Sequence, residues 1–207
     1  MAEVEIRVQL LPPYDNNCYV LVCPDTKESI IVDAPSDPDR ILELAHDTTV
    51  RYVVITHNHA DHWGALKELK ERLQTQVAAH QADAQALPIP LDLPLKDGDA
   101  LRIGGTEVSV IHTPGHTPGS ICLLVGKHLI TGDTLFPNGP GHSRTPDNLR
   151  QMIASITSKL FVLPDDTRVY PGHGAGTVLG PEKQNYGVFA SKPHDPNLAG
   201  DVTWTGS

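Results

Sequence analysis

The stretch Thr56-His57-Asn58-His59-Ala60-Asp61-His62 directly follows an unbroken apolar run, Tyr52–Ile55, which is typical of a buried strand. Three imidazoles and one carboxylate therefore lie within six residues at the end of a strand. Histidine and aspartate side chains are costly to cluster and to bury unless they bind something. Imidazole nitrogen and carboxylate oxygen suit zinc, iron or manganese. We therefore predict a metal site here, in preference to a surface histidine patch.

Three more candidate ligands lie in turns rich in glycine and proline, each after a predicted strand. They are His116 in Pro114-Gly115-His116, Asp133 in Thr131-Gly132-Asp133, and His173 in Pro171-Gly172-His173. Glycine beside each ligand permits a tight turn, so the strand end can aim the side chain at a shared centre. The total of five histidines and two aspartates is too large for one tetrahedral ion. It suits two ions that share a carboxylate and a hydroxide.

The remaining pattern predicts short strands interrupted by a few helices. Strands are expected at Val4–Leu11, Cys18–Val22, Ile30–Val32, Tyr52–Ile55, Val108–Ile111, Ile121–Val125, His128–Ile130 and Arg168–Tyr170. Helices are expected from near Asp61 to Leu73, after Thr145-Pro146 as far as Leu160, and at Asp37–Ala45. These elements suggest two similar α/β halves with the metal site between them.

Length and charge limit the classes of function. The chain has 207 residues, 39% of them hydrophobic, so we expect one domain over residues 1–207, with a tail or an ordered strap after about residue 190. The net charge of −9 argues against nucleic acid or an anionic membrane as a partner. No apolar run reaches the roughly 18 residues of a membrane span, and the N-terminal residues lack the basic start of a signal peptide.

Several residues outside the ligand set are expected to be structural. Cys18, Cys23 and Cys122 are odd in number and lie in strand-like stretches, so we interpret them as reduced, packed thiols of a cytoplasmic protein. Asp33 is expected to accept hydrogen bonds near the His57–His62 stretch rather than to bind metal. For His112, a packed strand-end residue and a neighbour of the ligands are both open.

The order His-x-His-x-Asp-His, followed by His116, Asp133 and His173, resembles the metallo-β-lactamase superfamily and in particular its glyoxalase II-like hydrolases. The match extends from Asn17-Cys18-Tyr19-Val20 to Pro171-Gly172-His173-Gly174. The resemblance implies an α/β fold, a four-layer αββα sandwich with the site at one edge of its two sheets. A β-lactamase is disfavoured, because those enzymes have cysteine where this chain has Asp133.

The resemblance also implies how the seven candidate ligands divide between two ions. The first ion would take His57, His59 and His116, and the second would take Asp61, His62 and His173, with Asp133 as the bridge. Zinc is the first expectation for these divalent ions, with iron or manganese as alternatives. Two such ions turn a shared water into hydroxide near neutral pH, and this bridging hydroxide would attack a carbonyl. Asp61 would orient it.

The implied reaction is hydrolysis of a small acyl-thiol such as S-lactoylglutathione, because a thiolate leaving group needs no general acid. The loop Phe136–Thr145 follows the bridging aspartate, and we expect His142 and Arg144 to contact an anionic substrate. Only 34 residues follow His173 (207 − 173), too few for the glutathione-gripping domain of full-length glyoxalase II-like enzymes, so the thiol carrier stays open. A homodimer is compatible with the sequence.

Three other functions stay open as alternatives. A persulfide dioxygenase with a single iron shares the skeleton, but it carries a Gly-Arg-Thr-Asp-like stretch where this chain has Gly141-His142-Ser143-Arg144. A lactonase would usually add a tyrosine near the site and a longer insertion. A non-catalytic metal-binding module would be expected to lack ligands, and all seven positions are filled here.

Overall fold

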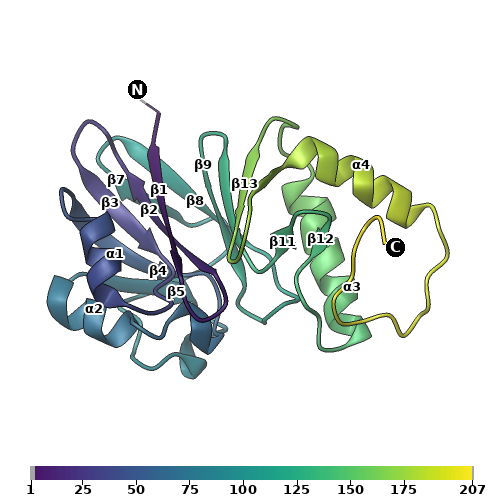
Figure 1. Ribbon diagram of the computed structural model, residues 1–207, viewed down its shortest axis with the longest axis horizontal. Coiled ribbons are helices and arrows are strands. Elements are labelled where there is room, and N and C mark those ends of the chain that lie inside the picture. The colour runs from purple at the N-terminus through teal and green to yellow at the C-terminus, as the bar shows by residue number, and fades with distance from the viewer. Residues whose placement is uncertain (1–2, 207) are drawn as a thin grey trace.

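Two six-stranded sheets form the centre of the computed structural model, which describes residues 3–206 (Figure 1). The first sheet follows chain order, with strands β1 (Glu5–Leu11), β2 (Asn16–Val22), β3 (Glu28–Val32), β4 (Thr49–Ile55), β5 (Gln76–His80) and β6 (Leu93–Leu95). The second, in the order β14-β13-β10-β9-β8-β7, has β7 (Ala100–Ile103), β8 (Thr106–His112), β9 (Ile121–Val125), β10 (His128–Gly132), β13 (Arg168–Pro171) and β14 (Thr177–Val178). A small hairpin of β11 (Leu135–Phe136) and β12 (Gly139–Pro140) follows β10.

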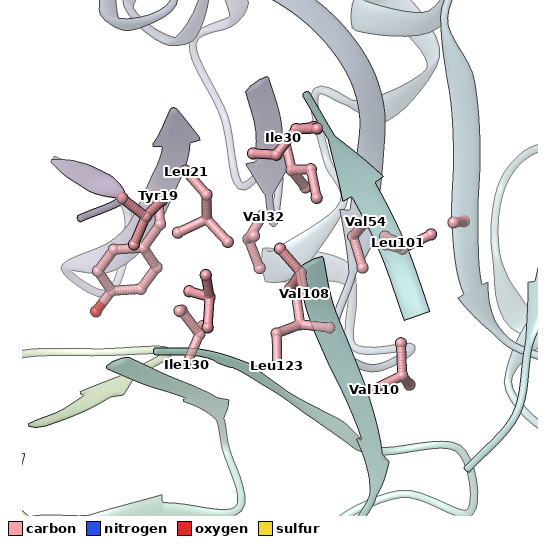
Figure 2. Close-up of a cluster of buried hydrophobic side chains, with 14 of the residues drawn as sticks. Tyr19, Leu21, Ile30, Val32, Val54, Leu101, Val108, Val110, Leu123 and Ile130 are labelled. Carbon is pink, nitrogen blue, oxygen red and sulfur yellow. The ribbon is translucent and has the colours of Figure 1, made fainter. Parts of the chain in front are cut away.

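The sheets pack face to face through one apolar core, shown in Figure 2. The first sheet contributes Leu21, Ile30, Val32 and Val54, and the second contributes Val108, Val110, Leu123 and Ile130, all of them buried. Alternate residues of the same strands point to the opposite face, as the two-residue repeat of a strand requires. Each fully buried aliphatic side chain contributes about 1.5–3 kcal/mol, and this burial holds the sheets in a defined relative position.

Helices cover the outer face of each sheet. α1 (Pro38–Leu44) and α2 (Leu66–Leu73) pack on the first sheet, and α3 (Pro146–Ser155) and α4 (Leu179–Ala190) pack on the second. The order of layers is therefore helix, sheet, sheet, helix, and the expected αββα sandwich is confirmed. Among the helices of residues 3–206, none is long and apolar enough to cross a membrane.

Strand directions bring distant parts of the chain to one edge. β8 and β10 are both antiparallel to β9, and β13 is parallel to β10, so all three point the same way. Ile121 is the first residue of β9, after the loop that follows β8. Its backbone N–H donates to the carbonyl of Thr56, the residue directly after β4, at 2.9 Å. Segments that follow β4, β8, β10 and β13 therefore leave their sheets beside one another.

The helices differ in detail from the sequence expectations. Thr145 caps α3 as predicted, because its Oγ1 accepts from the backbone N–H of Asn148 at 3.2 Å. The helix expected from Asp61 is divided into a 3₁₀ turn, Ala60–His62, and α2. Gly64 lies between them, where a Cβ would collide with the carbonyl of Pro35. The backbone therefore bends there to fit against the preceding loop.

Beyond α4, residues 191–206 turn back and pack on the outer side of the second sheet; this segment is called the strap below (Figure 1). Ser143 and Gly200 exchange backbone hydrogen bonds of 3.1 and 2.8 Å. Trp204 is 2% exposed, and its ring lies edge-on to Tyr186 and Phe189 of α4, with centroids 5.2 Å away in both cases. The strap thus closes the outer core of the second sheet.

Replacing Trp204 by Ala is expected to lower the free energy of unfolding by about 3–5 kcal/mol, because it removes a large buried side chain. Urea denaturation measures this change. Val162→Ala, at a side chain that is 70% exposed, serves as the control and should shift stability by less than about 0.5 kcal/mol. An equally small effect of both substitutions would show that the strap is not anchored by Trp204.

Candidate metal centre

The segment that leaves β4 is held by a buried carboxylate. Asp33 is 2% exposed, and its Oδ1 accepts from the backbone N–H of Thr56 at 2.8 Å. Its Oδ2 accepts from Thr56 Oγ1 and from His62 Nδ1, both at 2.8 Å. The expected role of Asp33 as a hydrogen-bond acceptor beside the histidine stretch is therefore confirmed.

Three predicted ligands from two loops form a first group, with His57 and His59 after β4 and His116 after β8. Nδ1 of His59 lies 3.1 Å from Nε2 of His57 and 2.9 Å from Nε2 of His116. Two nitrogens bound to one tetrahedral zinc at 2.0–2.1 Å would lie about 3.3 Å apart. The three nitrogens therefore have close to the spacing that a single ion requires.

Three others form a second group beside it, Asp61, His62 and His173. The Nε2 atoms of His62 and His173 are 3.1 Å apart. Oδ2 of Asp61 lies 3.4 Å from Nε2 of His173 and 3.7 Å from Nε2 of His62. This mixed set of nitrogen and carboxylate donors can also surround one ion.

Asp133 lies between the two groups. Its Oδ2 is 3.5 Å from Nε2 of His116 and its Oδ1 is 3.5 Å from Nε2 of His62. Close packing at Asp133 depends on Gly172, because a Cβ there would collide with Oδ1. Within residues 3–206, Oδ1 is buried and has no hydrogen-bond partner. A buried carboxylate oxygen without a donor is costly unless a cation faces it, so Asp133 fits a shared ligand.

In His116 and His173, the hydrogen bond of the ring nitrogen that faces away from the centre, Nδ1, fixes the direction of the nitrogen that faces it, Nε2. Nδ1 of His116 donates to the carbonyl of His142 at 2.8 Å, and Nδ1 of His173 donates to the carbonyl of Tyr14 at 3.0 Å. A neutral imidazole carries one proton, so Nε2 of both rings presents a lone pair to the centre. Lone pairs that converge in this way repel one another unless a cation lies among them. The donors therefore fit divalent metal ions, with the outer contacts usual for metal-bound histidine.

Burial and charge set the protonation of the centre. Burial lowers the pKa of His57 well below its usual value. Burial also opposes charge on His62, but the carboxylates of Asp33 and Asp133 outweigh it and raise its pKa to about 10. Burial tends to raise the pKa of Asp133, but the histidine rings that face it, His173 and His62 foremost, outweigh burial and hold this pKa well below the usual range. Asp133 is therefore ionised, and an ion that binds His62 displaces a proton.

Asn16, the first residue of β2, is a site neighbour that the sequence reasoning missed. It is fully buried, and its Nδ2 donates to the backbone carbonyl and to Oδ2 of Asp61, both at 2.9 Å. It also forms an isolated β-bridge with His173. These partners are 45 and 157 residues away along the chain, so no local pattern marks the contact.

The two residues predicted to contact substrate lie on the rim of the centre. Nη2 of Arg144 is 3.5 Å from Nε2 of His59, on the side of that ring away from the other histidines. The ring of His142 bonds Asp201 of the strap at 2.9 Å. A cavity of about 340 Å³ adjoins His142, lined by Asp133, the loop 136–142 and strap residues 201–203. The structure therefore joins the loop and the strap at one opening beside the candidate ligands.

Comparison with known proteins agrees with this geometry. The family model described as the metallo-beta-lactamase superfamily matches residues 11–173. The chain belongs to this superfamily. It is similar to hydroxyacylglutathione hydrolase GloC of Haemophilus influenzae, at 29% identity over 90% of this chain and 100% of the relative. The hydroxyacylglutathione hydrolase of Ruegeria pomeroyi is 40% identical over 77% of this chain but only 62% of its own length.

Solved structures show the same fold. The crystal structure of ETHE1 from Myxococcus xanthus aligns with a TM-score of 0.81 at 31% identity, covering 91% of this chain and 86% of that one. With the superfamily assigned and two groups of His and Asp side chains able to hold metal, the protein is a metal-dependent hydrolase. The seven predicted ligands are the six side chains of these two groups together with Asp133, which also groups with His57 and His62.

Asp133→Ala is expected to lower the content of both ions by at least about 10-fold, because its two oxygens face both groups. His173→Ala should empty mainly the second site, since His173 belongs to that group alone. Elemental analysis of the purified variants measures both effects. His46→Ala, at an exposed histidine outside the groups, is the control. Full metal content in Asp133→Ala would rule out the bridging role.

Proposed function

We propose that this protein hydrolyses thioesters with two divalent ions. Two groups of donors share one carboxylate, Asp133, and this arrangement carries the proposal. The first ion would be held by His57, His59 and His116, and the second by Asp61, His62 and His173. When bound, such ions lower the pKa of a shared water and polarise a carbonyl. Zinc is the first candidate, with iron or manganese as alternatives.

Asp61 is proposed as the catalytic residue among these side chains. It is partly exposed, and its Oδ2 is held by the Nδ2 of Asn16 at 2.9 Å. This bond fixes the direction of the carboxylate, so Oδ2 can orient a water and accept its proton. A thiolate is a stable anion near neutral pH and leaves without protonation. A thioester therefore needs no further acid from the site, in contrast to an amide.

The rim of the centre supports an anionic substrate. If His59 binds an ion through Nδ1, its Nε2 carries the proton, and the guanidinium of Arg144 lies 3.5 Å away. Two donors at this separation do not bond each other, but they can share a carboxylate or carbonyl oxygen of a substrate. The relatives named hydroxyacylglutathione hydrolase support a glutathione thioester as that substrate.

We also infer that residues 1–207 form one domain and that it acts in the cytoplasm. All elements of residues 3–206 pack on the two sheets, and the strap after residue 190 returns to them; residues 1, 2 and 207 lie outside the described part. Cys18, Cys23 and Cys122 are buried and unpaired, as in proteins of a reducing compartment.

The direct test is hydrolysis of S-lactoylglutathione by protein loaded separately with zinc, iron or manganese. We expect turnover with at least one metal and its loss on chelation, because the hydroxide depends on the ions. The Asp61→Asn variant should keep the first ion and bind the second more weakly, and it should lose at least about 100-fold in kcat even when both ions are supplied in excess. Absence of turnover with every metal would contradict hydrolysis of glutathione thioesters.

A persulfide dioxygenase is the second candidate, and one observation favours it. Nε2 of His116 and of His57 lie 3.5 and 3.9 Å from Oδ2 of Asp133, so two histidines and one carboxylate can form a facial triad. This ligand set is typical of mononuclear iron oxygenases. Oxygen uptake with glutathione persulfide by the iron-loaded protein, without thioester hydrolysis, would support it over the first candidate.

Arg144→Ala is expected to raise KM for an anionic thioester about 10-fold and to leave metal content unchanged, because it removes one charged hydrogen bond on the rim. Steady-state kinetics and elemental analysis measure the two effects. Arg102→Ala, at a side chain that is 77% exposed and whose one ion pair among residues 3–206 is with Glu107, is the matched control. Unaltered kinetics in Arg144→Ala would remove this residue from the substrate site.

A further inference from the structure

A second buried carboxylate, Asp83, lies close to the first histidine group. Asp83 follows β5 and precedes a short 3₁₀ turn, Ala84–Ala86, and it is 1% exposed. It is not among the candidate ligands, and its nearest hydrogen-bond partners belong to two loops that come from different sheets. A buried carboxylate is costly unless hydrogen-bond donors surround it. The donors to Asp83 therefore indicate which segments of the chain this side chain positions.

These bonds reach both loops that carry the first group. Oδ2 of Asp83 accepts from the backbone N–H of Asn58 at 3.0 Å, and Asn58 lies between His57 and His59. The same oxygen accepts from Oγ1 of Thr117 at 2.6 Å, directly after His116. One carboxylate therefore connects the segments of all three histidines.

The other oxygen of Asp83 holds the far side of the His116 turn. Oδ1 accepts from the backbone N–H of Gly119 at 2.8 Å. A Cβ at Gly119 would lie 2.5 Å from Cγ of Asp83, so only glycine permits this approach. Thr117 is bonded further to Ser120, whose Oγ lies 2.8 Å from Thr117 Oγ1 and accepts from the Thr117 N–H at 3.0 Å. The turn is thus built around the carboxylate.

Asp33 and Asp83 bond different parts of the metal centre. Asp33 bonds the ring of His62, in the second group, and the residue before His57. Among residues 3–206, Asp83 has no hydrogen bond to a histidine ring; it accepts from backbone and hydroxyl groups beside the first group. The position of His116 relative to His59 depends on how two loops from different sheets are joined, and Asp83 bonds both of those loops directly.

From this geometry we infer that Asp83 is the positioning residue of the first ion site. It sets the separation of His57 and His59 from His116, so that the three nitrogens can share one ion. The inference rests on the proposed function only in that the histidines bind metal; it does not depend on the reaction catalysed.

The test compares the affinities of the two ion sites in the intact protein. Asp83→Asn keeps the shape of the side chain but places an NH₂ group against N–H or O–H donors, so at least one bond is lost. Zinc titration against a chromophoric chelator should show that the first ion site binds about 10–100-fold more weakly and that the affinity of the second site is unchanged. Thr117→Val removes one of the three bonds to Asp83, together with the hydroxyl contact to Ser120, and should give a smaller loss at the same site.

Asp92→Asn is the matched control. Asp92 likewise accepts from a backbone N–H, that of Val77 in β5 at 2.7 Å, and from Nζ of Lys70 at 2.6 Å. Among residues 3–206 it has no hydrogen bond to a ligand loop, so both affinities should match the unaltered protein. Equal weakening of both sites in Asp83→Asn, or no change in either, would overturn the inference. Two-site zinc binding without thioester turnover would contradict the proposed function while the selective loss in Asp83→Asn still supported the inference. Absence of binding of zinc, iron and manganese alike by the unaltered protein would overturn both.

Discussion

Asp133 holds an ionised carboxylate between two groups of imidazoles, and the rest of the structure is arranged to keep it there. Lone pairs of His116 and His173 and an unpartnered oxygen of Asp133 converge here, so contacts among the seven donors do not by themselves hold the set together. Their positions are therefore maintained by surrounding structure rather than by mutual contacts. Each donor follows a strand end, where a buried strand restricts the backbone on one side of the turn.

The sandwich core and the buried carboxylates act at different scales. Side chains such as Val54 and Ile130 fix the two sheets relative to each other, which brings four loops to one edge. Asp33 and Asp83 then hold those loops through hydrogen bonds from backbone N–H groups, hydroxyls and one ring. Glycines at 119 and 172 permit approaches that any Cβ would prevent. These hydrogen bonds and close approaches set the directions of the ligand side chains, because the apolar core fixes only the positions of the sheets.

Local sequence predicted much of the secondary structure. Apolar runs such as Tyr52–Ile55 lie within observed strands. The predicted helix cap, Thr145, directly precedes the first residue of α3. β5 was missed because its apolar part is only Val77, Ala78 and Ala79. α4 was missed because it contains Gly180, Pro181 and Gly187, which have low helix propensity, and its position depends on packing of Leu179 and Phe189.

The sequence by itself determined which residue types are available for metal and that each lies just beyond a strand, and with the family resemblance it predicted how they divide between two ions. Only the tertiary structure decided that Asn16 bonds Asp61, that Asp83 joins the two histidine loops, and that Arg144 lies beside His59. Metal-binding residue types are marked locally, in a dense run of His57–His62 and in glycine turns. Their supporting contacts join residues far apart in the chain, and these depend on how two sheets pack rather than on any local pattern.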